Sequence, residues 1–67
     1  MPDRRFLTLK EVCSLTGLQK STIYALIKAS RFIAPVKISS SASRWPSDQV
    51  FQWMDDRIAE RDAALSK

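Results

Sequence analysis

The only glycine of this 67-residue chain, Gly17, separates two short segments that each follow a helical pattern. Glycine adopts the left-handed backbone conformation that closes a helix without a steric penalty. Upstream, Thr8 and Glu11 have the spacing of a capping box, in which each side chain pairs with the backbone N–H of the other residue. The pattern therefore predicts a helix over about 8–15, then a turn so tight that the next helix, over about 20–29, must cross the first.

Apolar residues recur at helical spacing in both segments. Those of the first helix are Leu9, Val12, Cys13 and Leu15, and those of the second are Ile23, Leu26 and Ile27, with Leu18 expected to pack into the turn. The outer face of the second helix is then polar, which is typical of a helix-turn-helix. Two short helices around a glycine also occur in small bundles that touch no nucleic acid, so the helices alone leave both interpretations open.

Charge is sorted along the chain, and this favours the first interpretation. Residues 48–67 hold more acidic than basic side chains, whereas residues 12–47 contain no Asp or Glu and five cations: Lys20, Lys28, Arg31, Lys37 and Arg44. Most charge runs form solvated surface, but this one coincides with the second helix and the segment that follows it. Such a surface is suited to a phosphate backbone, where counterion release makes affinity fall steeply with salt.

The length allows one domain, 1–67, with one small core and one functional surface. Cys13 lies on an inner stripe and is expected to be a small buried hydrophobe, without a partner for an intramolecular disulfide. No apolar run approaches the length of a membrane span, and the first residues lack the pattern of a secretory signal. We therefore expect a cytoplasmic protein with no membrane partner.

Catalysis and metal binding have little support. The chain has one cysteine and no histidine, which argues against zinc. Asp55 and Asp56 are adjacent, so on a helix they point about 100° apart and do not converge on one substrate. One glycine does not make a glycine-rich phosphate loop. We expect no enzymatic activity, no cofactor and no small-molecule substrate.

The helical pattern stops after the second helix and gives way to a strand pattern. The alternation Val36-Lys37-Ile38 predicts a short strand with its two aliphatic side chains inward and Lys37 outward, and Arg44-Trp45 is the expected antiparallel return. The two strands would form a small β-wing over about 36–45. Its serine-rich tip, 39–43, is alternatively a flexible linker.

A third helical pattern covers about 47–64 and begins at an expected cap, Ser47-Asp48-Gln49. One strip of this helix contains Val50, Trp53, Met54 and Arg57, and another contains Phe51, Met54, Ile58 and Leu65. We expect Phe51 and Trp53 to lie in the core instead of stacking on bases, and the residues beyond Ile58 to project or fray. The predicted fold is therefore mainly α: a small winged helix-turn-helix domain, three helices with a short two-stranded β-wing between helices 2 and 3.

A longer run of residues matches the sequence pattern of a known protein family. The positions are Leu7-x-Leu9-x-Glu11-Val12-x-x-Leu15-Thr16-Gly17-Leu18-x-x-Ser21-Thr22-Ile23-Tyr24, then Ile27-Lys28, Arg31-Phe32-x-x-Pro35-Val36-Lys37-Ile38, and Trp45 with Val50-x-x-Trp53. From residue 6 to about 62 this pattern resembles the AlpA-type phage and prophage transcriptional regulators. The resemblance implies a domain related to the MerR N-terminal module and to phage excisionases, which binds double-stranded DNA and uses no cofactor.

The resemblance also implies roles for single positions, with the helix after Gly17 in the major groove. Candidates for base readout are Gln19, Lys20, Ser21, Thr22 and Ala25, and candidates for phosphate contact are Tyr24, Lys28, Arg31, Lys37 and Arg44. Two positions depart from the family. Gln19 stands where a serine-like cap is common, so the helix would start slightly later and rely on Ser21. Ala25 stands where a basic residue is common, which leaves at most a thymine methyl contact.

Three other functions remain open from the sequence. An excisionase shares the scaffold and would bend DNA on tandem sites. A protein-interaction module, such as an antirepressor, would use the face from Phe51 to Ile58. RNA binding is disfavoured because the aromatic residues fall mainly on inner faces. One domain of this size buries only about 600–1,000 Å² on DNA, so specific binding would need two or more copies, in contact through the last helix if they dimerise.

Overall fold

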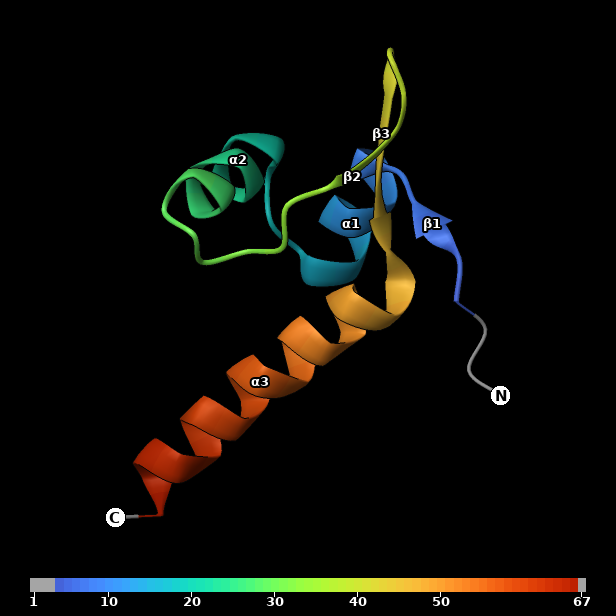
Figure 1. Ribbon diagram of the computed structural model, residues 1–67. Helices are drawn as coiled ribbons and strands as arrows, with labels where there is room; N and C mark the ends of the chain where they lie inside the picture. The colour runs from blue at the N-terminus through green and yellow to red at the C-terminus, as the bar shows by residue number, and fades with distance from the viewer. Residues whose placement is uncertain (1–3, 67) are drawn as a thin grey trace.

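The computed structural model describes residues 4–66, which form three helices and three short strands (Figure 1). In chain order these are β1 (Phe6–Leu7), α1 (Leu9–Thr16), α2 (Lys20–Lys28), β2 (Val36–Ser39), β3 (Ala42–Pro46) and α3 (Ser47–Leu65). The predicted fold class is confirmed: the domain is mainly helical, and the β2–β3 hairpin stands between the second and third helices.

Helix α1 begins and ends as its sequence pattern predicts. The backbone N–H of Thr8 donates to Glu11 Oε1 at 2.9 Å, and the backbone N–H of Glu11 donates to Thr8 Oγ1 at 3.2 Å, which completes the capping box. At the other end Gly17 has φ +74° and its N–H donates to the Cys13 carbonyl at 2.8 Å. The short turn through Leu18 and Gln19 then starts α2.

The core gathers one or two side chains from almost every element. Its buried members are Leu7, Val12, Ile23, Phe32, Trp45 and Val50, and half-buried residues that include Cys13, Leu18, Leu26 and Ile27 pack against them. The indole N–H of Trp45 donates to the Ile33 carbonyl at 2.9 Å, so the polar atom of the largest core side chain is satisfied. The inner stripes predicted for both helices therefore meet, except that Leu15 is exposed.

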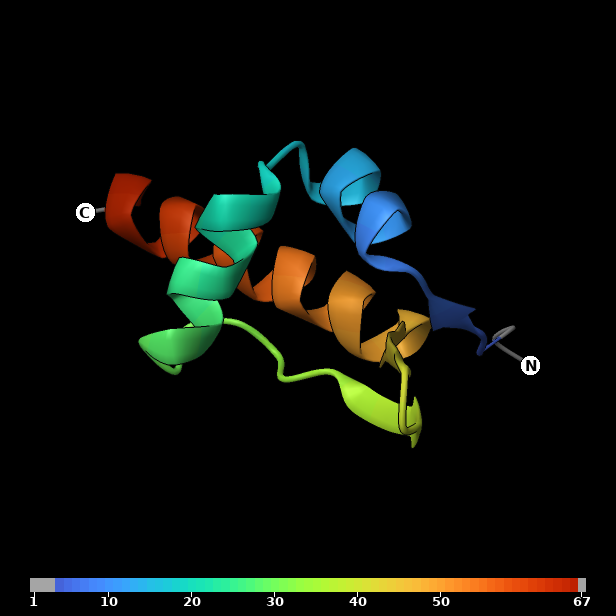
Figure 2. The ribbon, with the colours of Figure 1, turned by 90° about the horizontal axis from the view of Figure 1, so that it is seen from above.

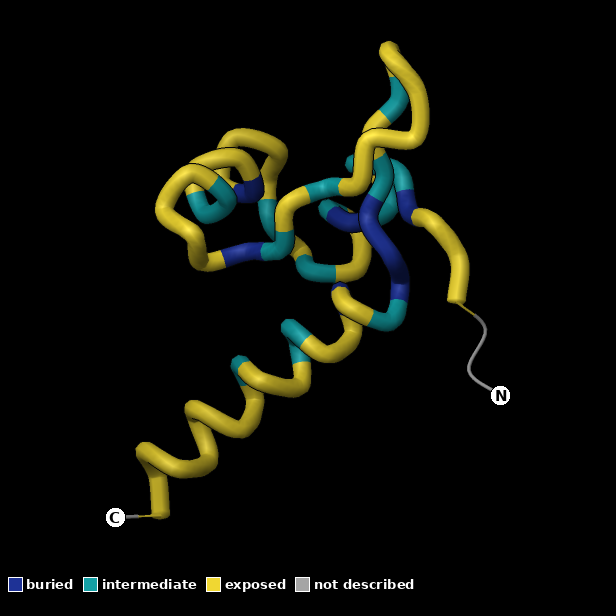
Figure 3. Tube along the Cα trace, viewed as in Figure 1, coloured by how far each residue is buried: buried dark blue, intermediate teal, exposed yellow. Residues whose placement is uncertain are grey.

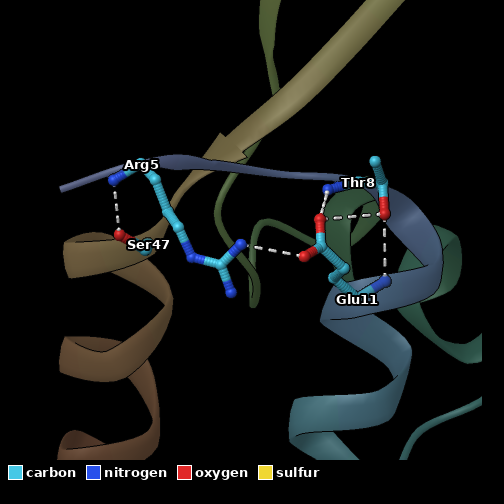
Figure 4. A network of polar contacts seen from close by, with 4 residues as sticks. All are labelled: Arg5, Thr8, Glu11 and Ser47. Atoms are coloured by element: carbon cyan, nitrogen blue, oxygen red, sulfur yellow. Dashed lines mark hydrogen bonds and ion pairs between the residues drawn. The ribbon is translucent and has the colours of Figure 1, made fainter. Parts of the chain in front are cut away.

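Strand β1 is a feature that sequence reasoning missed. It pairs antiparallel with β3, Leu7 opposite Trp45, and the three strands have the order β1-β3-β2. Beside this pairing, Ser47 makes two hydrogen bonds to the backbone of Arg5. Its N–H donates to the Arg5 carbonyl at 2.7 Å. Its hydroxyl accepts from the Arg5 N–H at 2.9 Å (Figure 4). The prediction of Ser47 as helix cap was wrong, because its hydroxyl accepts from the backbone N–H of Arg5, the residue before β1, and Pro46 occupies the cap position without a side-chain bond.

Strand β2 is exposed along its whole length, so the prediction that Val36 and Ile38 point inward was wrong. Their side chains are 44% and 49% exposed. The alternation correctly indicated a strand, but no element of the described chain packs on the hairpin beyond its base, and it projects from the domain (Figures 1 and 3).

Helix α3 touches the domain with its first turns only and then runs away from it (Figure 1). Val50 is buried and Trp53 is half-buried, but Phe51, expected in the core, is 48% exposed. From Ile58 to Ser66 every residue is exposed (Figure 3). The last part of the chain therefore projects as continuous helix as far as Leu65.

Candidate nucleic-acid interface

Helix α2 turns one side to the core and leaves the other open. Ile23 is buried and Leu26 and Ile27 pack against the core. Ser21, Ala25 and Lys28 follow the i, i+4, i+7 spacing of the opposite side, and all three are exposed. The flanks of this strip carry the exposed residues Lys20, Thr22 and Tyr24. The structure therefore brings the predicted α2 residues onto one accessible surface.

The amino end of α2 is open as well. Gln19 has an extended backbone and makes no side-chain bond to the first turn, which confirms that it caps poorly. The helix nevertheless begins directly at Lys20, so the later start expected from this residue was wrong. The first turn contains no acidic residue. Its free N–H groups and the positive end of the helix dipole are available to an anion.

The carboxyl end of α2 closes without glycine. Ser30 has φ +59°, its N–H donates to the Ile27 carbonyl at 3.0 Å, and the Arg31 N–H donates to the Leu26 carbonyl at 2.7 Å. These two bonds form a Schellman motif. The motif places the exposed Arg31 directly behind the last turn, which holds Lys28.

The hairpin contributes Lys37 and Arg44, but on opposite faces. Lys37 is paired with Ser43, and Val36 is paired with Arg44, so the register sends the two cations to different sides of the two-stranded ribbon. Arg44 is half-buried, and its guanidinium donates to the Ser43 carbonyl at 2.9 Å. Sequence reasoning missed the two exposed aliphatic residues of this ribbon, because alternation indicates a shared face but not whether that face is covered.

The α2 helix and the hairpin lie on the same side of the molecule. In Figure 1 both stand above the first turns of α3, and the hairpin tip points away from that helix. From above, in Figure 2, α2 and the hairpin are in front and α3 passes behind them. A rod-shaped ligand could therefore lie across both without meeting the distal part of α3.

Ion pairing divides the cations into two groups. Four pairs are present in residues 4–66: Arg4–Asp48, Arg5–Glu11, Arg57–Glu60 and Arg61–Asp62. All four use arginines outside residues 12–47. Within the described part of the chain, none of the five cations of that segment is paired with an acid. Within residues 4–66, uncompensated positive charge is therefore carried by α2, by Arg31 just beyond it and by the hairpin, and also by Lys10 on α1.

A helix-turn-helix followed by a β-hairpin and a third helix defines a winged helix-turn-helix domain. The chain belongs to the AlpA family: residues 5–58 match the family described as "Prophage CP4-57 regulatory protein (AlpA)". It is also 41% identical over 64 residues to the "Uncharacterized protein ORF88" of Enterobacteria phage P4, and the match covers 91% of this chain and 73% of that protein. No solved structure matches. Family membership suggests a small phage DNA-binding regulator.

No helix within residues 4–66 has the length and apolar character to cross a membrane.

Proposed function

We propose that the protein is a small phage-type transcriptional regulator that binds specific sites on double-stranded DNA. In this proposal α2 lies in the major groove and the β2–β3 hairpin contacts the adjacent backbone or minor groove. The observation that carries it is the unpaired charge on these two elements, on one side of the domain. Membership in a prophage regulatory family supports the same function.

The exposed strip of α2 divides by chemistry into two sets of contacts. Gln19 and Ser21 carry side-chain donors and acceptors at the amino end, which suits base edges in the major groove, and the Ala25 methyl suits a thymine methyl group. Lys20 and Thr22 flank this readout surface. The residues that we assign to the phosphate backbone are Tyr24, Lys28, Arg31, Lys37 and Arg44.

The opposed cations of the hairpin are compatible with this arrangement. A two-stranded ribbon that enters a groove edge-on has a phosphate backbone on either side. Lys37 would then contact one backbone and Arg44 the other, while the exposed serine hydroxyls at the tip donate to nearby phosphates.

The proposal is tested by a salt series. Fluorescence anisotropy with duplexes tiled across the DNA that flanks the protein's own gene first locates a bound fragment. On that fragment we expect Lys28→Ala and Lys37→Ala each to weaken binding and to lower the slope of log affinity against log salt by about 0.9, one phosphate contact each.

Arg4→Ala is the matched control, because it removes the same charge from an exposed pair with Asp48 outside the proposed interface. We expect it to leave the slope unchanged. Unchanged affinity and slope in both lysine variants would contradict the proposal. Circular-permutation gels on the bound fragment then separate a promoter regulator from an excisionase, which bends DNA on tandem sites.

A further inference from the structure

The α3 helix carries an apolar strip that no other element of residues 4–66 covers. Phe51, Ile58 and Leu65 are 48%, 49% and 74% exposed, and each is seven residues from the next. On a helix this spacing keeps the three side chains close to one line along the axis. Half-buried Met54 lies beside the line, one turn after Phe51, and packs against the core. We call Phe51, Ile58 and Leu65 the α3 strip.

The strip is distinct from the side of α3 that faces the domain. That side is marked by buried Val50 and by Trp53, whose indole N–H donates to the Arg31 carbonyl at 2.8 Å and whose ring meets Phe32 at 4.8 Å between centroids. At about 100° per residue, the strip lies roughly a third of a turn away from that side. In the part of the chain that the structure describes, the domain therefore leaves the strip exposed.

Charges border the strip in an ordered way. One edge carries three aspartates, again spaced by seven: Asp48, Asp55 and Asp62. The other edge carries Arg57 and Arg61. The strip thus has one acidic and one basic edge.

We propose that the α3 strip binds the same strip of a second copy of this chain, with the two helices parallel. In a parallel pair the basic edge of each helix meets the acidic edge of the other, whereas an antiparallel pair brings like edges together. The intrahelical pair Arg61–Asp62 is exposed and contributes little, so Arg61 can exchange partners. Arg57 is half-buried, and its guanidinium lies over the Trp53 ring, 5.2 Å from the ring centroid.

The course of α3 fits this arrangement. Its last turns are exposed all round, and a helical segment of that length has little stability by itself in water, so packing against a partner would stabilise it. Because α3 leads away from α2 and the hairpin, a parallel pair leaves both α2 helices uncovered (Figure 1). The apolar contact is small, so the dimer should be weak.

Sedimentation equilibrium without DNA tests whether the α3 strip mediates dimerisation. We expect concentration-dependent dimerisation that Ile58→Gln weakens by about tenfold or more, since two apolar side chains leave the contact. Ala59→Gln is the control: it makes the same polar addition on the same turn, off the strip, and we expect no change. A protein that stays monomeric to millimolar concentration, or equal effects of both variants, would overturn the proposal. Circular dichroism confirms that each variant is folded.

Single-cysteine variants in a Cys13→Ala background test the orientation. Leu65→Cys is expected to form a disulfide-linked dimer under mild oxidation, because parallel helices place these positions opposite each other. Linkage only in a mixture of Leu65→Cys with Phe51→Cys would show an antiparallel pair and overturn the parallel arrangement.

Charge reversal at Asp62 is a second measurement. In a parallel pair, position 62 faces the basic edge of the partner helix, so Asp62→Arg should weaken the dimer. A stronger dimer would contradict the proposal. All these measurements are made without DNA, so their outcome tests the dimer proposal independently of the DNA-binding proposal.

Discussion

At the scale of single residues, two of the described positions, 4–66, have left-handed backbone conformations, and only one of them is glycine. Gly17 has φ +74° and Ser30 has φ +59°. Gly17 ends α1 and Ser30 ends α2. These two residues therefore set the geometry of the helix-turn-helix and of the segment that follows it. Opposite substitutions at the two positions should change stability in opposite directions.

Gly17→Ala should lower the free energy of unfolding by about 1 kcal/mol. The cause is the backbone alone, because a Cβ added at Gly17 meets nothing within 4 Å. Urea unfolding followed by circular dichroism measures the change. A loss of several kcal/mol would show that packing and not the backbone conformation requires glycine here.

Ser30→Gly should instead raise the free energy of unfolding, by about 0.5–1 kcal/mol, because it removes the strain of a side chain in the left-handed region. Ser30 is exposed and its hydroxyl makes no hydrogen bond in the described structure, so the substitution removes no contact. Ser14→Gly, inside α1, is the control and should be destabilising. A destabilised Ser30→Gly variant would contradict this account of the α2 terminus.

At the scale of elements, β1 is held between α1 and α3 by polar contacts at both ends (Figure 4). Arg5 contacts Ser47 through its backbone, and its guanidinium donates to Glu11 at 3.0 Å. Ser47→Ala should lower the free energy of unfolding by about 1–2 kcal/mol, since it leaves the partly buried Arg5 N–H without its acceptor. Ser66→Ala, on the exposed end of the chain, should have little effect in the same urea titration.

The capping box gives this region a pH dependence. The backbone N–H of Thr8, and then the Arg5 side chain, hold the pKa of Glu11 below its ordinary value. A carboxyl whose pKa is lowered on folding contributes stability above the ordinary glutamate pKa of about 4.3, and this is lost as the pH falls through the lowered pKa. Glu11→Gln should therefore destabilise the protein at pH 7 and reduce the drop in stability between pH 7 and pH 3. An unchanged drop would contradict this assignment.

The elements that sequence reasoning predicted are those that local chemistry determines. The capping box and Gly17 define α1 from residues within one or two turns of each other. Strand β1 was missed because its two residues form a strand only through pairing with β3, about forty positions away. The same long-range contact takes the hydroxyl of Ser47 from its expected capping role. For Val36, Ile38 and Phe51, periodicity identified a shared face but could not show that nothing covers it.

At the scale of the whole molecule, the fold separates two surfaces with different chemistry. Of the cations without an acidic partner in residues 4–66, all but Lys10 of α1 lie on α2, just after it, and on the hairpin, while the α3 strip lies on a helix that leaves the domain in another direction (Figures 1 and 2). The α2 part of the candidate site could be predicted from sequence, because helical spacing determines which residues share the exposed side of the helix. The opposed faces of Lys37 and Arg44 could not, because they depend on the hairpin register.

The central claim is that α2 and the hairpin together form the DNA-binding surface. The most direct test is an NMR titration of the labelled protein with its bound duplex, which reports each backbone amide separately. We expect the largest shift changes within 19–31 and 36–44, with the amides of the distal part of α3, 59–65, little changed. Changes concentrated on α3, or spread evenly over the domain, would contradict the account.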